Sequence, residues 1–104
     1  MSTVDTRTGT PWSARALRDE RLADDVALYD ITRQAATVLS SLLLQRMRGA
    51  EDDAARAVWA ARRRLVKRQV LALDPGDRAG LVAQQEAWAA EIDALESAPS
   101  RISA

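Results

Sequence analysis

The sequence predicts an all-α protein, namely a three-helix bundle with a long first helix and an antiparallel pair made by the second and third helices. Three observations support this prediction. Ala, Leu, Arg, Glu and Gln, which favour helices, dominate the 104 residues. Apolar residues recur at steps of three and four positions, and no segment alternates with the period of two that is typical of strands. The four Gly and three Pro fall mostly at the boundaries of these periodic segments.

A chain of this length forms one domain, because its apolar residues suffice for a single core of modest size. We expect the polar residues 1–10 to be a disordered leader, residues 11–96 to form the helical domain and residues 97–104 to be a flexible tail. The leader lacks the apolar stretch of a secretory signal, and the chain lacks the long apolar run of a membrane span. We therefore expect a cytoplasmic protein that does not enter a membrane.

The first helix is expected over residues 11–48. Thr10 is a candidate N-cap and Pro11 suits a first helical turn, whereas Gly49 is a natural C-terminal cap. The apolar face of this helix consists of Leu28, Ile31, Ala35, Val38, Leu39, Leu42 and Leu43.

The second helix is expected over residues 52–73. Glu51, Asp52 and Asp53 stand at its start, where the helix dipole favours acidic side chains. Trp59 is expected in the core, on an apolar face made by Val58, Trp59, Leu65, Val66, Gln69, Val70 and Leu73.

The third helix is expected over residues 75–96. Asp74 is a candidate cap, and Pro75 fits the first turn. Trp88 is expected in the core, because it belongs to the periodic face Leu81, Gln85, Trp88, Ile92 and Leu95.

The first helix is much longer than the other two, at about 57 Å against about 33 Å. When the second helix folds back from Gly49, Leu73 comes to lie near Leu28, so residues 11–27 extend beyond it. Either a second protomer covers this overhang, which we favour, or the segment bends back near residues 18–25. The overhang and a second apolar face of the helix predict an interface that completes the bundle by dimerisation, with Trp12, Leu17, Leu22, Val26 and Leu44 as its candidate residues.

Charge is segregated along the chain although the net charge is zero. Residues 54–73 carry six basic and no acidic side chains, whereas residues 74–96 carry six acidic side chains and only Arg78 as a base. The simplest interpretation is that the two helices attract each other and their charges pair. The alternative is a basic stripe that binds nucleic acid or an acidic partner, formed by Arg56, Arg63, Arg64, Lys67 and Arg68.

Arg62 differs from these basic residues because it lies in the middle of the apolar face of the second helix. It either extends its guanidinium to solvent or stacks on Trp88, or it makes a buried polar contact that sets the register or meets a ligand.

The sequence excludes several kinds of chemistry. It contains no Cys and no His, so it has no thiolate zinc site, no cysteine nucleophile and no imidazole base. The contiguous acids at Asp24–Asp25 and at 51–53 diverge on a helix, which does not suit a metal site. We expect no cofactor, no metal and no enzymatic activity.

One all-helical enzyme class does not need His or Cys. Lys67 together with the segment Asp74–Arg78 is loosely similar to part of the chorismate mutase pattern, in which Arg and Lys hold a dianion. Gly49 interrupts the position where that family's long helix continues, and residues 75–96 lack its late glutamine. An enzyme of this type is therefore a remote alternative.

The function predicted from the sequence is that of a small cytoplasmic bacterial protein–protein interaction module: an adaptor, an antitoxin-like regulator or an assembly subunit. We expect a homodimer with a further protein partner whose identity the sequence does not reveal. A nucleic-acid-associated regulator is the main alternative.

Overall fold

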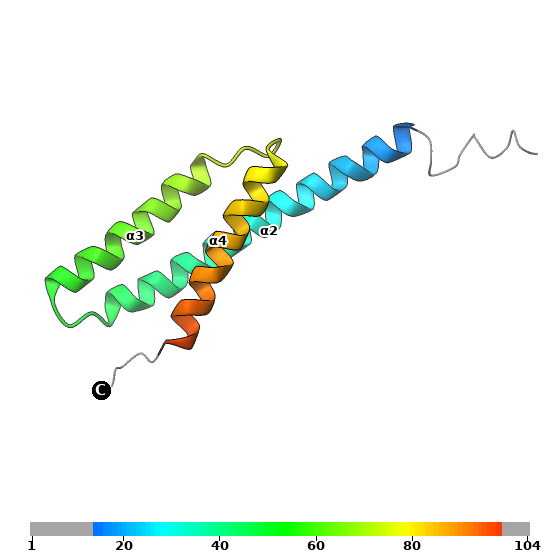
Figure 1. The fold of residues 1–104 in the computed structure, drawn as a ribbon. Helices are drawn as coiled ribbons and strands as arrows, with labels where there is room; N and C mark the ends of the chain where they lie inside the picture. Colours follow the sequence, from blue (N-terminus) through cyan, green and yellow to red (C-terminus); the bar gives the residue numbers. More distant parts are fainter. Residues whose placement is uncertain (1–13, 99–104) are drawn as a thin grey trace, which may run out of the picture.

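The computed structural model describes residues 14–98, with side chains from Arg21 onward. This part of the chain forms three α-helices and no strand: α2 (Ala14–Arg48), α3 (Asp53–Leu71) and α4 (Arg78–Ser97) (Figure 1). The all-α prediction with a long first helix is confirmed. The second and third helices are slightly shorter than expected, and the leader and most of the tail lie outside the described residues.

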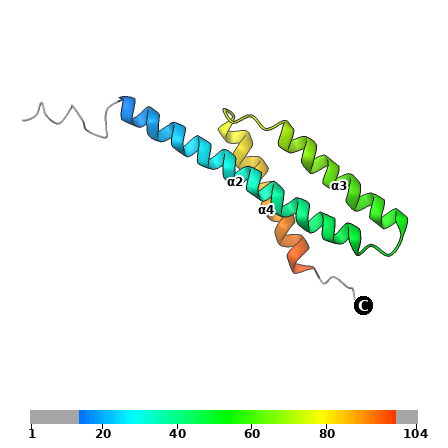
Figure 2. The same ribbon diagram turned by 180° about the vertical axis from the view of Figure 1, so that it is seen from behind.

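The long helix α2 is the support on which both other helices pack. α3 returns antiparallel along it, and α4 crosses it obliquely (Figures 1 and 2). α3 and α4 run in opposite directions, as expected, but no Cα atom of α3 lies within 8 Å of one in α4. Side chains link them, because the Trp88 indole Nε1 donates to Oε1 of Gln69 at 3.4 Å.

α2 is continuous from Ala14, so the alternative in which the chain bends back near residues 18–25 is wrong. The first turn of α4 reaches α2 at Asp25, which forms an ion pair with Arg78. The N-terminal end of α2 extends beyond both other helices (blue in Figure 1). The overhang predicted from the helix lengths is therefore present in the fold.

The core lies where α3 and α4 both meet α2. Its central cluster is formed by Ala36, Leu39, Leu43, Val66 and Trp88. Leu81 is also buried, and Trp59, Val70, Leu73, Ile92 and Leu95 are partly buried against the cluster. Trp88 therefore occupies the predicted core position, and Trp59 lies at the edge of the core.

The buried face of α2 is rotated from the predicted one. Ile31 and Val38 are exposed, whereas Thr32 and Ala36 are buried. Small side chains on this face let the neighbouring helices approach closely. The hydroxyl of Thr32 donates to the carbonyl oxygen of Leu28 at 2.7 Å, which satisfies the buried polar group within its own helix. On α3, Val58 and Leu65 are likewise exposed although the periodicity placed them on the apolar face.

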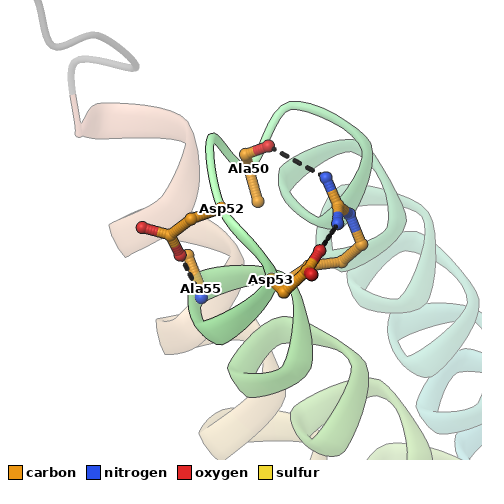
Figure 3. Close-up of polar contacts among 5 residues, drawn as sticks. Ala50, Asp52, Asp53 and Ala55 are labelled. Carbon is orange, nitrogen blue, oxygen red and sulfur yellow. Dashed lines mark hydrogen bonds and ion pairs between the residues drawn. The ribbon is translucent and has the colours of Figure 1, made fainter.

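Local acids begin both shorter helices. Asp52 is the N-cap of α3, and its Oδ1 accepts a hydrogen bond from the backbone N–H of Ala55 at 2.7 Å (Figure 3). Asp53 in the first turn accepts from Nη1 of Arg56 at 2.6 Å, and Nη2 of Arg56 donates to the carbonyl oxygen of Ala50 at 3.3 Å. The hydrogen bond from Ala55 satisfies a backbone N–H that the helix itself leaves unpaired, and the contacts of Arg56 tie the first turn to the preceding loop.

The start of α4 differs from the prediction. Asp77, and not Asp74, is the N-cap, and its carboxylate accepts from the N–H of Gly80 at 3.0 Å. Asp74 instead accepts from the N–H of Gly76, and its carbonyl accepts from the N–H of Asp77 at 2.9 Å. Residues 74–77 therefore form a turn with Pro75 at its second position, and the helix begins only after that turn.

Candidate interaction surface

An open groove runs between α2 and α3, with a volume of about 440 Å³. Small side chains of α2 form much of its wall, and Val70 and Leu71 are the aliphatic residues that α3 contributes to the opposite side. The residues that line it are Arg33, Ala36, Thr37, Ser40, Ser41, Leu44, Arg63, Lys67, Val70 and Leu71. Leu71 is 86% exposed at one end, so the groove presents an apolar surface to solvent.

Three cations and no acid line the groove. Nε of Arg63 donates to the carbonyl oxygen of Ser40 at 3.4 Å, and the guanidinium of Arg33 lies 5.7 Å from the ring centre of Tyr29. Lys67 is exposed. Within residues 21–98, none of these three cations forms an ion pair. The groove therefore has a positive charge that its own surroundings do not neutralise.

Two of the candidate interface residues continue this surface along α2. Leu22 and Val26 are 63% and 60% exposed, and they lie on one line of the helix with Arg33, Ser40 and Leu44, since successive members are one or two helical turns apart. Leu44 is partly buried in the groove itself. The structure thus places three of the five candidate interface residues and two residues of the basic stripe, Arg63 and Lys67, on one surface.

The remaining residues of the stripe are arranged less uniformly than the sequence suggested. Arg56 is held by Asp53 and Ala50 at the start of α3. Arg64 and Arg68 are exposed and form no ion pair among the side chains described. Among the described side chains, the expected charge pairing between α3 and α4 consists of a single ion pair, between Arg62 and Glu91.

Arg62 lies at the edge of the α3–α4 contact and not in the core. Its side chain is 47% exposed, and it forms an ion pair with Glu91 beside Trp88. Arg62 is therefore not a buried polar residue, and Val66, one turn later, occupies the buried position.

Two predicted interface residues lie outside the part of the chain whose side chains the structure describes. Trp12 lies outside the described residues, and Leu17 lies on α2 before the first described side chain.

The sequence analysis does not identify six of the groove residues: Arg33, Ala36, Thr37, Ser40, Ser41 and Leu71. The spacing that unites Leu22, Val26 and Leu44 also passes through Arg33 and Ser40, so a signal for them was present. Leu71 does not belong to the periodic face predicted for α3. No local pattern indicates that it lies exposed at the groove.

The part of the chain whose side chains the structure describes, residues 21–98, contains no cluster of three or more side chains suited to hold a metal ion. No helix within residues 14–98 is long and apolar enough to cross a membrane. Lys67 lines the groove, whereas Arg78 contacts Asp25 where α4 begins, so these two residues of the chorismate mutase-like pattern have different neighbours.

No protein-family model matches this chain, and neither a curated protein nor a solved structure matches it.

Proposed function

We propose that this chain is a non-enzymatic, cytoplasmic protein–protein interaction module that works as a homodimer and belongs among bacterial adaptors, antitoxin-like regulators or assembly subunits. The observation that carries the proposal is the continuous surface formed by Leu22, Val26 and the groove between α2 and α3. Exposed aliphatic side chains aligned beside an apolar groove are typical of surfaces that bind another protein.

The overhang of α2 supports a second copy as one component of the assembly. A single helix that extends beyond its bundle has little stability of its own, because most helical stability in proteins comes from packing. The domain is also small enough to benefit from burying more surface. Dimerisation through α2 leaves the outer side of α3 and the exposed face of α4 for a further protein partner.

The test is the absolute mass of the full chain in solution, measured by light scattering at low and at high salt. We expect a mass near twice 11.4 kDa in both, because apolar contacts hold the seam. Val26→Asp should return the mass to that of a monomer. A monomeric wild-type protein would contradict the proposal.

Val58→Asp is the matched control for Val26→Asp. Val58 is 61% exposed, almost the same as Val26, but it lies on α3 and does not line the groove. The control should keep the dimer mass, and circular dichroism should show equal helix content in both variants. Equal loss of association in the two variants would mean that the seam is not on α2.

A nucleic-acid-associated regulator is the second candidate, and Arg64 and Arg68 are the observation that favours it. Both are exposed on α3 without an ion pair among the described side chains. Fluorescence anisotropy with duplex DNA would show salt-dependent binding that the Arg64→Glu/Arg68→Glu variant loses. Binding that is equal in wild type and variant, or absent from both, would contradict this candidate.

A further inference from the structure

We infer that two copies of the chain pair through antiparallel α2 helices about a two-fold axis at Arg33, with Leu22 of each copy seated against the partner's Leu44. The inference rests on the proposed dimer and adds its arrangement. It names a second copy as the occupant of the groove between α2 and α3.

The geometry of α2 is self-complementary about Arg33. The groove extends along α2 from Arg33 to Leu44, a span of eleven positions. Leu22, Val26 and Arg33 form an exposed row on the same line of the helix, and this row also spans eleven positions. When two such helices lie antiparallel with Arg33 opposite Arg33, the exposed row of each copy enters the groove of the other. Val26 then lies opposite the partner's Ser40, where a small side chain leaves room for it.

The two-fold operation also provides cover for the overhang. α3 lies beside the C-terminal half of α2 only, since the groove that the two helices line ends near Arg33 and Leu71. In the antiparallel pair, the partner's α3 lies beside the N-terminal half of α2 that has no α3 of its own. The same patch then serves both copies, which closes the assembly at two chains.

The charge of α2 changes sign at the same point. Residues 31–48 carry three arginines and no acid: Arg33, Arg46 and Arg48. Residues 14–30 carry three arginines and five acids, the acids being Asp19, Glu20, Asp24, Asp25 and Asp30. An antiparallel pair places each acidic half beside the basic half of its partner and beside the cations of the partner's α3. A parallel pair would place like charges together, which is unfavourable.

Asp30 and Arg33 provide the central contact of this arrangement. Neither residue forms an ion pair within the described side chains, and Arg33 is held against Tyr29. On the two-fold axis each Arg33 faces the partner's Arg33. Asp30 of each copy lies one helical turn away, where it supplies the opposite charge that this pair of arginines requires.

Cysteine cross-linking of the full chain tests the arrangement directly, because the sequence contains no Cys. Leu22→Cys and Leu44→Cys proteins are prepared separately, one with a tag that changes its mass, then mixed and oxidised. We expect a covalent dimer that contains one chain of each kind. Leu22→Cys alone should not cross-link, because the two cysteines would be about 33 Å apart along the helices.

The outcomes separate this inference from the proposed function. If Leu22→Cys alone cross-links as efficiently as the mixture, the helices pair in another way and the inference is overturned, although the dimer stands. A dimer mass without any cross-link would likewise overturn the inference and leave the proposed dimer standing. A monomeric mass overturns both. Val58→Cys measures the background from random collision, because Val58 has nearly the same exposure as Leu22 and lies off the seam.

Charge exchange at the axis provides a second readout. Asp30→Arg and Arg33→Asp each leave four like charges at the centre of the dimer, so each should raise the dimer Kd roughly tenfold, or about 1.4 kcal/mol. The variant with both changes exchanges the charges and should recover most of the wild-type affinity. Failure of the double variant to improve on both single variants would exclude Arg33 from the axis.

Discussion

The guanidinium of Arg78, in the first turn of α4, donates a hydrogen bond to the carboxylate of Asp25 on α2, and Nη1 and Oδ1 lie 2.5 Å apart. The contact joins positions separated by 53 residues in the sequence. It fixes the point at which α4 begins to cross α2. It also marks where the overhang starts, because α2 extends beyond both other helices on the N-terminal side of this contact (Figure 2).

We predict that this ion pair contributes little to stability. Both side chains are partly exposed, so solvent screens their attraction, and a double-mutant cycle of Arg78→Ala and Asp25→Ala should give a coupling of about 0.5 kcal/mol. Urea unfolding at one fixed protein concentration measures it, since a dimer's stability depends on concentration. A coupling above about 2 kcal/mol would mean that the pair is shielded from water in solution.

The N-cap of α3 should matter more than this ion pair. Asp52→Ala removes the acceptor for the N–H of Ala55 and should lower the free energy of unfolding by about 1 kcal/mol (Figure 3). Asp52→Asn keeps an oxygen in the same place and should remain close to wild type. Thermal or urea unfolding compares the two, and equal losses would show that charge, and not the hydrogen bond, is what α3 requires.

Features decided by neighbouring residues could be predicted from the sequence. The end of the first helix at Arg48 and the acidic start of the second depend on contacts that span four residues or fewer. Trp88 is predictable because the periodic apolar residues of its helix lie on a single side of that helix. The sequence predicts the cap of α4 three residues too early, because Asp74 and Asp77 are both suitable acids. Only the turn between them decides which one begins the helix.

Features decided by packing could not be read from the sequence. Leu22, Val26 and Leu44 are recognisable as a second face of α2, and Arg63 and Lys67 as part of a basic stripe. Their meeting in one groove depends on how α3 is rotated about its own axis, which is set by Val66 and Trp59 against α2. That rotation turns Arg62 outward and Arg63 toward Ser40.

Two glycines should respond differently to alanine. Gly49 follows α2 without the left-handed backbone that a glycine cap often adopts, and an added Cβ would meet only the carbonyl oxygen of Gln45 at 3.5 Å. Gly49→Ala should therefore be neutral or stabilise by up to about 1 kcal/mol, because it restricts the unfolded chain.

Gly80→Ala is the matched comparison for Gly49→Ala. A Cβ at Gly80 would collide with the carboxylate of Asp77, which caps α4. The cap would have to move, so we expect the variant to lose the capping contribution, about 1 kcal/mol, against a gain in helix propensity of similar size. Gly80→Ala should thus be less stable than Gly49→Ala by thermal unfolding, and the reverse order would contradict the cap at Asp77.

The rotation of the buried face of α2 gives the most demanding prediction. Leu39 is fully buried, and Val38 beside it is exposed, although the sequence assigns both to one apolar face. Leu39→Ala should lower the free energy of unfolding by 2 to 5 kcal/mol, roughly the range for a fully enclosed leucine, which is a large part of the stability of a small domain. Val38→Ala should cost less, about 1 kcal/mol, because Val38 is 39% exposed and the two methyl groups that are removed are only partly buried. Urea unfolding of the two variants at equal concentration compares them, and similar losses would mean that Val38 is buried in solution and that the face predicted from periodicity is the real one.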